Sequence, residues 1–154
     1  MNGNVTEIRS RTAAAISTAE DAGLSIVVPF TTPKQTRAAL KHAAEMSSGL
    51  NGTIRLIDAV AIPIQRPISE PQVNGKFLKR RLEEMAEETG MPVHVDIVYT
   101  RDRMECLSRC LGVHSLVVIA LRSLWWPSFE RKLARFLRRA GHDVVLISRD
   151  ATRS

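Results

Sequence analysis

Apolar residues gather into short runs, or alternate with polar ones, at five places along the chain. The run Leu116–Leu121 is unbroken and Ser25–Phe30 is nearly so, which is typical of strands buried on both faces. Val93–Tyr99 alternates apolar and polar residues, which predicts a strand with one wetter face at an edge of a sheet. Two further strands are predicted at Thr53–Val60 and Asp143–Ser148.

Helical spacing fills the segments between these strands. Thr32, Pro33 and Gln35 form an N-terminal capping pattern for a first helix, and Gly49 is expected to end it. Three more helices are predicted, at about Val73–Glu88, Met104–Leu111 and Ser128–Arg139. In the first of these three, the residues expected to face the core are Phe77, Leu78, Leu82, Met85 and Ala86.

Strands that alternate with helices predict an α/β fold, here an open parallel five-stranded sheet with helices on both faces. The 154 residues suffice for one domain with its own core, which we place at residues 23–149. Residues 1–22 are polar and alanine-rich, so we expect a flexible or loosely docked extension. Residues 150–154 are expected to form a polar tail.

Composition narrows the classes of partner and compartment. The formal net charge is +6, and much of the excess lies in the last helix, at Arg131, Lys132, Arg135, Arg138 and Arg139. Such local charge suits an acidic protein or an anionic membrane surface, and we do not expect nucleic acid as a partner. Two cysteines suit a reducing compartment, and the sequence shows neither a membrane-spanning run nor a secretory signal. A cytoplasmic protein is therefore expected.

Four segments resemble the universal stress protein family, and the likeness extends over residues 24–148. Ile26–Leu40 is similar to that family's opening strand and helix, Leu56–Val60 to its second strand, and Ser115–Ala120 and Val144–Ser148 to its last two strands. The resemblance implies an adenine nucleotide α-hydrolase-like fold with strand order 3-2-1-4-5. That order agrees with the edge position inferred for the third strand.

The chain departs from the family's ATP-binding pattern at three places. ATP-binding members carry G-x2-G-x9-G-[ST] after the fourth strand, because phosphates approach a backbone without Cβ atoms. Here that segment has no glycine, and Arg131-Lys132 stand where Gly-[ST] is expected. Thr31 and Thr32 replace the family's adenine-contacting Asp and the Gly after it, and Thr100–Asp102 replaces a glycine-containing turn. We therefore expect no cofactor and no ATP binding of the family's type.

A narrower likeness gives two alternatives. Leu121–Ile147 also resembles the stress-protein module of potassium-sensing histidine kinases and of the cytosolic end of some amino-acid transporters, so the chain could serve as the regulatory domain of a transporter or kinase. In some kinases a Ser-Arg-Ser element in this loop is associated with cyclic di-adenylate, and here Leu121 precedes Arg122-Ser123. The second alternative is a sensor of an adenine nucleotide or cyclic di-adenylate, with seven candidate residues: Thr31, Thr32, Val60, Arg122, Ser123, Arg131 and Lys132.

Enzymatic and metal-binding interpretations find less support in the sequence. Asp58, near the end of the second strand, could act as a base, but no paired acid or nucleophile is evident beside it. Cys106, Cys110 and His114 have a helical spacing, but a fourth metal ligand is not evident and Gly112 interrupts the helix. We therefore predict a non-catalytic regulatory or signalling domain without a metal, and leave a redox role of the cysteines open.

Two surfaces are expected to contact partners. Trp125-Trp126 lie together in the loop after the fourth strand and could bind a partner, a base or a membrane interface. The fifth strand carries the apolar run Val144, Val145, Leu146 and Ile147 at a predicted edge, without proline or glycine to prevent pairing. We expect a homodimer through this strand, as the family resemblance also implies. The competing interpretation is that residues 1–22 cover the same edge.

Overall fold

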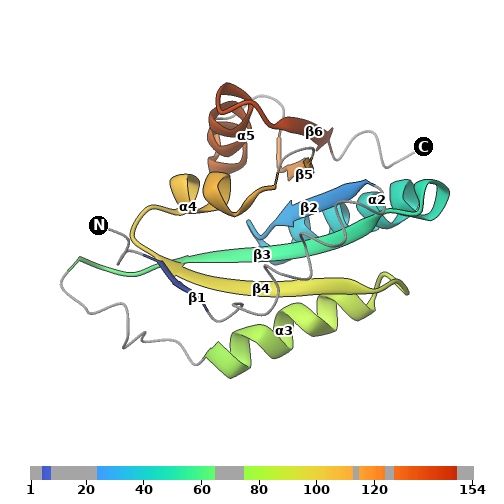
Figure 1. Cartoon of the computed structure of the whole chain (residues 1–154), viewed down its shortest axis with the longest axis horizontal. Helices are drawn as coiled ribbons and strands as arrows, with labels where there is room; N and C mark the ends of the chain where they lie inside the picture. Colours follow the sequence, from blue (N-terminus) through green and yellow to red (C-terminus); the bar gives the residue numbers. More distant parts are fainter. Residues whose placement is uncertain (1–4, 8–23, 65–74, 113–114, 124–126, 149–154) are drawn as a thin grey trace.

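Among the residues that the structure describes, six strands form one sheet in the order β1-β4-β3-β2-β5-β6 (Figure 1). The computed structural model describes residues 5–7, 24–64, 75–112, 115–123 and 127–148. The strands are β1 (Val5–Glu7), β2 (Ser25–Pro29), β3 (Thr53–Ala61), β4 (Val93–Thr100), β5 (Ser115–Leu121) and β6 (Asp143–Ser148). The five strands β2 to β6 are mutually parallel. The predicted parallel sheet and its order are therefore confirmed.

The described helices cover both faces of this sheet. Helices α2 (Pro33–Leu50) and α3 (Gly75–Glu87) pack on one face, with α4 (Arg103–Cys110) and α5 (Phe129–Arg139) on the other. Alternate strand residues divide the core between the faces: Ile26 and Val28 point to the first, and Val27 to the second. The two-layer covering explains why the strands read as continuous apolar runs.

Local capping sets where three of these helices begin. Thr32, Asp102 and Ser128 precede α2, α4 and α5, and the side chain of each accepts a hydrogen bond from the backbone N–H three residues on. At the end of α2 the prediction is wrong by two residues. The helix passes through Gly49, and Asn51 ends it in the left-handed conformation with φ 53°. Asparagine tolerates that conformation better than most residues, so it can replace glycine there.

The third predicted strand is not a fully open edge. Residues Val5–Glu7 of β1 pair antiparallel with Val98–Thr100 of β4. From Asp96 to Thr100 the side chains of β4 are buried without alternation, because both faces of this half are covered. The structure thus places part of the N-terminal extension beside β4, whereas the competing interpretation placed it at the opposite edge, on β6.

One predicted core residue lies outside. Phe77 is 57% exposed, with the Arg81 guanidinium 5.9 Å from its ring centroid. Its neighbour Leu78 instead packs against the core, together with the buried Leu82, Met85 and Ala86 further along α3. Adjacent helical residues are about 100° apart around the helix axis, so Phe77 and Leu78 do not both face the sheet.

A buried ion pair joins two central strands to the end of a helix. Arg55 of β3 is 4% exposed and Asp96 of β4 is 1% exposed, and their Nε and Oδ2 atoms are 2.5 Å apart. The same guanidinium donates a 2.7 Å hydrogen bond to the carbonyl oxygen of Cys110, the last residue of α4. A cation at this position also opposes the negative end of the helix dipole.

Replacing Asp96 with Ala leaves the Arg55 guanidinium buried without its counter-ion, so the free energy of unfolding should fall by about 3–5 kcal/mol. Urea titration measures the loss. The control is Glu84→Ala, which removes an exposed pair with Arg80 and should change stability by less than about 1 kcal/mol. The double variant Arg55→Met, Asp96→Leu should recover most of the loss. An equally unstable double variant would contradict the charge argument.

Candidate functional site

The carboxyl ends of the parallel strands meet at one edge of the sheet, above the point where the strand order reverses. That point lies between β2 and β5, since β3 and β4 follow on one side and β6 on the other. In open α/β sheets ligands bind in the crevice at such a reversal. The candidate site is therefore the space between the ends of β2, β3 and β5 and the first turn of α5.

In this crevice lies a side chain that the sequence did not predict, Arg103. Its Nε donates a 2.8 Å hydrogen bond to the carbonyl oxygen of Ala59 in β3, and its second terminal nitrogen donates a 3.3 Å bond to the carbonyl of Phe30 after β2. The guanidinium carbon lies 4.4 Å from the ring centroid of Phe129 in α5. One cation thus connects two strand ends and a helix.

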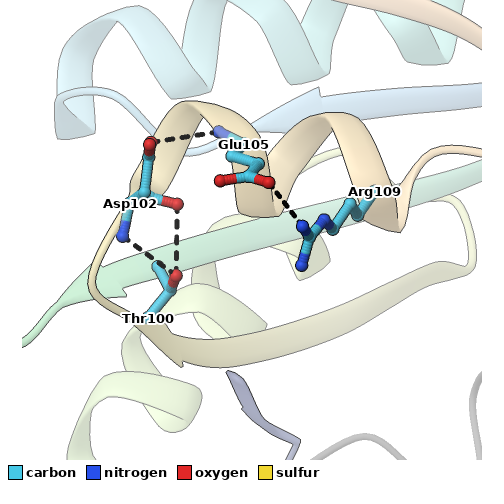
Figure 2. Close-up of polar contacts among 4 residues, drawn as sticks. All are labelled: Thr100, Asp102, Glu105 and Arg109. Carbon is cyan, nitrogen blue, oxygen red and sulfur yellow. Dashed lines mark hydrogen bonds and ion pairs between the residues drawn. The ribbon is translucent and has the colours of Figure 1, made fainter. Parts of the chain in front are cut away.

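Arg103 is the first residue of α4, and Figure 2 shows the polar contacts of the turn that precedes it and of the helix that follows. The Thr100 hydroxyl accepts a 3.2 Å bond from the Asp102 backbone N–H and donates a 3.1 Å bond to the Asp102 carbonyl oxygen. Asp102 Oδ1 in turn accepts a 3.1 Å bond from the Glu105 N–H, and Glu105 pairs with Arg109 one turn further on. This turn is the one already noted for lacking a glycine, and Arg103 follows it directly.

Asp58 contributes a buried carboxyl group near the same strand ends. It is 7% exposed, and burial raises its pKa from 3.8 to about 6, while the positive charge of Arg103 partly offsets that rise. Burial also raises the pKa of Tyr99 above 10.0, with a further contribution from the negative charge of Asp58. No paired acid or nucleophile is evident beside Asp58 among the described residues, and this arrangement suits a structural carboxyl group.

The residues predicted to bind a nucleotide lie around the crevice, but most of them already make contacts within the chain. The backbone N–H of Thr31 donates a 3.1 Å bond to the hydroxyl of the buried Thr36. Thr32 caps α2, and its hydroxyl also contacts the amide oxygen of Gln35. Val60 is half-buried and packs on the α2 face of the core. The capping role was predicted, and it leaves Thr32 engaged within its own helix.

The remaining candidates divide between the end of β5 and the first turn of α5. Arg122 is exposed and Ser123 is half-buried just after β5. Ser128 caps α5, and Arg131 and Lys132 are the third and fourth residues of this helix. Arg131 lines a groove beside β6, away from Thr31 and Thr32. The structure therefore does not bring all seven residues into one pocket.

The structure describes only part of two other predicted groups, the tryptophan pair and the cysteine–histidine set. Trp125, Trp126 and His114 lie outside the described residues. Cys106 is buried, Cys110 is half-buried, and the two are not joined by a disulfide. Within the described part of the chain, no group of three metal-ligating side chains is found and no helix is long and apolar enough to cross a membrane.

The outer side of β6 forms a second surface of interest. Val144, Val145 and Leu146 are half-buried, and Ile147 is 7% exposed. A groove of about 720 Å³ runs along this strand, and four arginines of α5 are among the residues that line it. Arg138 of α5 donates a 3.0 Å bond to the carbonyl oxygen of Val144, so a charged side chain from the neighbouring helix covers part of this edge.

Comparisons with known proteins agree on the fold. No protein-family model matches the chain, and no curated protein is similar to it in sequence. A solved universal stress protein in complex with cAMP is similar over 82% of this chain and 97% of its own, with 15% identity and a TM-score of 0.54.

Similar structures also include a universal stress protein from Archaeoglobus fulgidus and a universal-stress-family protein from Burkholderia pseudomallei. The first has 13% identity, a TM-score of 0.58 and coverage of 80% of this chain and 93% of its own. The second has 20% identity, a TM-score of 0.52 and coverage of 80% and 94%. The chain has the universal stress protein fold.

Asp58 should make stability depend on pH in the acidic range. Folding raises the pKa of Asp58 from 3.8 to about 6. The contribution of Asp58 to the free energy of unfolding is therefore fully present below pH 3.8, where the group is protonated in both states. It is lost as the pH rises through about 6 and the folded state has to hold a buried negative charge. Asp58→Asn should abolish this decline and raise the free energy of unfolding at neutral pH by up to about 3 kcal/mol. Urea titrations across this range measure it, with Asp143→Asn, in an exposed position, as control. An unchanged slope in Asp58→Asn would contradict the assignment.

Proposed function

We propose that this chain is a non-catalytic regulatory domain with the universal stress protein fold, and that it works by pairing with a second copy through β6 without binding ATP in its crevice. The observation that carries the proposal is the position of Arg103. Its guanidinium bonds to the carbonyls of Phe30 and Ala59 and stacks on Phe129, at the place where this type of sheet accepts a ligand.

The backbone around the crevice also supports the absence of ATP binding. Phosphates bind where backbone N–H groups converge without interference from Cβ atoms, which usually requires glycines. Between β5 and α5 the chain has none, and the first turn of α5 holds a buried carboxylate, Glu130, that is 2% exposed. A negative charge there would repel a phosphate directed at the helix N-terminus.

The proposed pairing rests on the outer edge of β6. Its apolar residues are only half-covered, and an antiparallel contact between two such strands across a two-fold axis is self-complementary. Such a contact would bury the side chains of Val144, Val145 and Leu146 further. It would also pair the backbone groups of this edge that Arg138 does not already bind. Partner proteins, such as a transporter or kinase contacted through Trp125 and Trp126, remain part of the proposal as predicted from the sequence.

A second candidate function is an adenine-nucleotide sensor. One solved protein with this fold is a complex with cAMP, and Arg122 and Ser123 follow β5 at the crevice. A nucleotide or cyclic di-adenylate would have to displace Arg103 from Phe129 and both carbonyls. The sensor therefore requires a rearrangement of the β4–α4 turn, which the capping contacts of Asp102 oppose.

Thermal unfolding with ATP, cAMP and cyclic di-adenylate distinguishes the two functions. The unmodified chain should show the same midpoint with and without cAMP and cyclic di-adenylate, because Arg103 already occupies the strand ends. ATP should shift the midpoint no more than inorganic triphosphate does. A saturable rise with cAMP or cyclic di-adenylate, or a rise with ATP beyond that of triphosphate, would favour the sensor. Arg103→Ala should lower the free energy of unfolding by about 1.5–3 kcal/mol, the range for hydrogen bonds to charged groups. The control is Arg101→Ala, which removes an exposed hydrogen bond to Pro63.

Val145→Lys should convert the dimer to a monomer, because it places a charge in the proposed contact without opening the fully buried part of the core. Light scattering at tens of micromolar measures the mass of each variant. The control Ile64→Lys changes an apolar residue that is 82% exposed and lies after β3, and it should leave the dimer unchanged. A monomer of the unmodified chain under these conditions, both with and without an added polyanion, would rule out the pairing.

A further inference from the structure

The groove beside β6 carries an unusual stripe of positive charge. Arg131, Arg135, Arg138 and Arg139 of α5 all line it, and their spacing of four, seven and eight residues keeps them on one side of the helix. Over those eight positions the helix rises about 12 Å. None of the described residues that line the groove is acidic, so this part of the groove is cationic.

The helix dipole explains part of this stripe. Cations in the last turn are favourable, which accounts for Arg138 and Arg139. Arg131 lies in the first turn and Arg135 in the middle of the helix, where the dipole gives a cation no advantage or disfavours it. Their placement on the groove side therefore calls for another reason.

Two arginines of the stripe, Arg135 and Arg139, lack a carboxylate partner among the described residues. Elsewhere in the described part of the chain, four arginines pair with Asp or Glu side chains: Arg37, Arg55, Arg80 and Arg109. Among the described residues, Arg135 and Arg139 have no carboxylate within ion-pair distance, and Arg138 bonds to a neutral backbone carbonyl. The acidic residue of α5, Glu130, is buried and does not line the groove.

Pairing through β6 would bring two such stripes together. A two-fold axis perpendicular to the sheet keeps α5 of both copies on the same face, so the two grooves would meet along the axis. Like charges facing each other within a Debye length, about 8–10 Å at moderate salt, oppose association. We propose that a polyphosphate anion binds between the two stripes and promotes dimerisation. This proposal rests on the pairing through β6 proposed above.

The chemistry of the groove indicates a chain of phosphate groups. Guanidinium groups bind phosphate oxygens in pairs of parallel hydrogen bonds, and a stripe of this length spans several phosphates. Among the described residues, the lining includes no Phe, Tyr or Trp on which a base could stack. Recognition should therefore depend on the phosphate chain itself, whether it is inorganic or part of a nucleotide.

The test measures dimerisation of the full chain by sedimentation velocity, with inorganic triphosphate added at constant ionic strength. Triphosphate should lower the dimer dissociation constant by about tenfold in a saturable way, within the usual range of coupling between two binding events. Neutralising the stripe with Arg135→Gln and Arg139→Gln should remove this response and strengthen the dimer in the absence of triphosphate. The control, Lys79→Gln with Arg80→Gln, changes two exposed residues of α3 and should behave as the unmodified chain.

The outcomes separate the two proposals. A dimer whose stability is the same in triphosphate and in chloride would overturn the anion site alone. A monomer at every triphosphate concentration would overturn the pairing and the shared site with it. Equal binding of triphosphate to the monomeric Val145→Lys variant, measured by calorimetry, would overturn the contribution of the second copy. ATP should act like triphosphate, and a much stronger effect of ATP would overturn recognition through phosphates.

Discussion

The guanidinium of Arg103 holds together the carboxyl ends of two central strands and the start of a helix. It contacts a carbonyl after β2, a carbonyl of β3 and a ring of α5, while its own backbone begins α4. Backbone carbonyls at strand ends need a hydrogen-bond donor, which water or a ligand can supply. Here Arg103 supplies the donor for two of these carbonyls, so they are hydrogen-bonded within the chain.

The sequence predicted the strands and helix starts well because each depends on nearby residues. The strand β6 has the predicted bounds, since a buried strand shows as a local apolar run. Ser128 and Thr32 cap the helices that they were expected to begin, because capping needs only a side chain and an N–H three residues on. The end of α5 beside Gly141, with φ 94°, follows for the same reason.

The features that sequence reasoning missed depend on residues far apart in the chain. Arg103 bonds to carbonyls 44 and 73 positions away, and backbone carbonyls leave no trace in a sequence pattern. β1 has three residues, and its pairing with β4 joins positions about 90 apart, as from Val5 to Thr100. Phe77 shows a different limit. The helical pattern allowed two adjacent large residues to face inward, and packing against the sheet selected Leu78.

The pairing of β1 with β4 affects how many copies of the chain could join edge to edge. A parallel sheet with two open edges can stack head to tail without end, as in a fibre, because each edge can accept a different neighbour. Here Val5–Glu7 occupy the carboxyl half of β4 in antiparallel pairing, which leaves β6 as the more accessible side. A contact between two β6 strands would use that side in both molecules, so growth would stop at a closed pair. Three residues near the N-terminus would in this way limit polymerisation of the sheet.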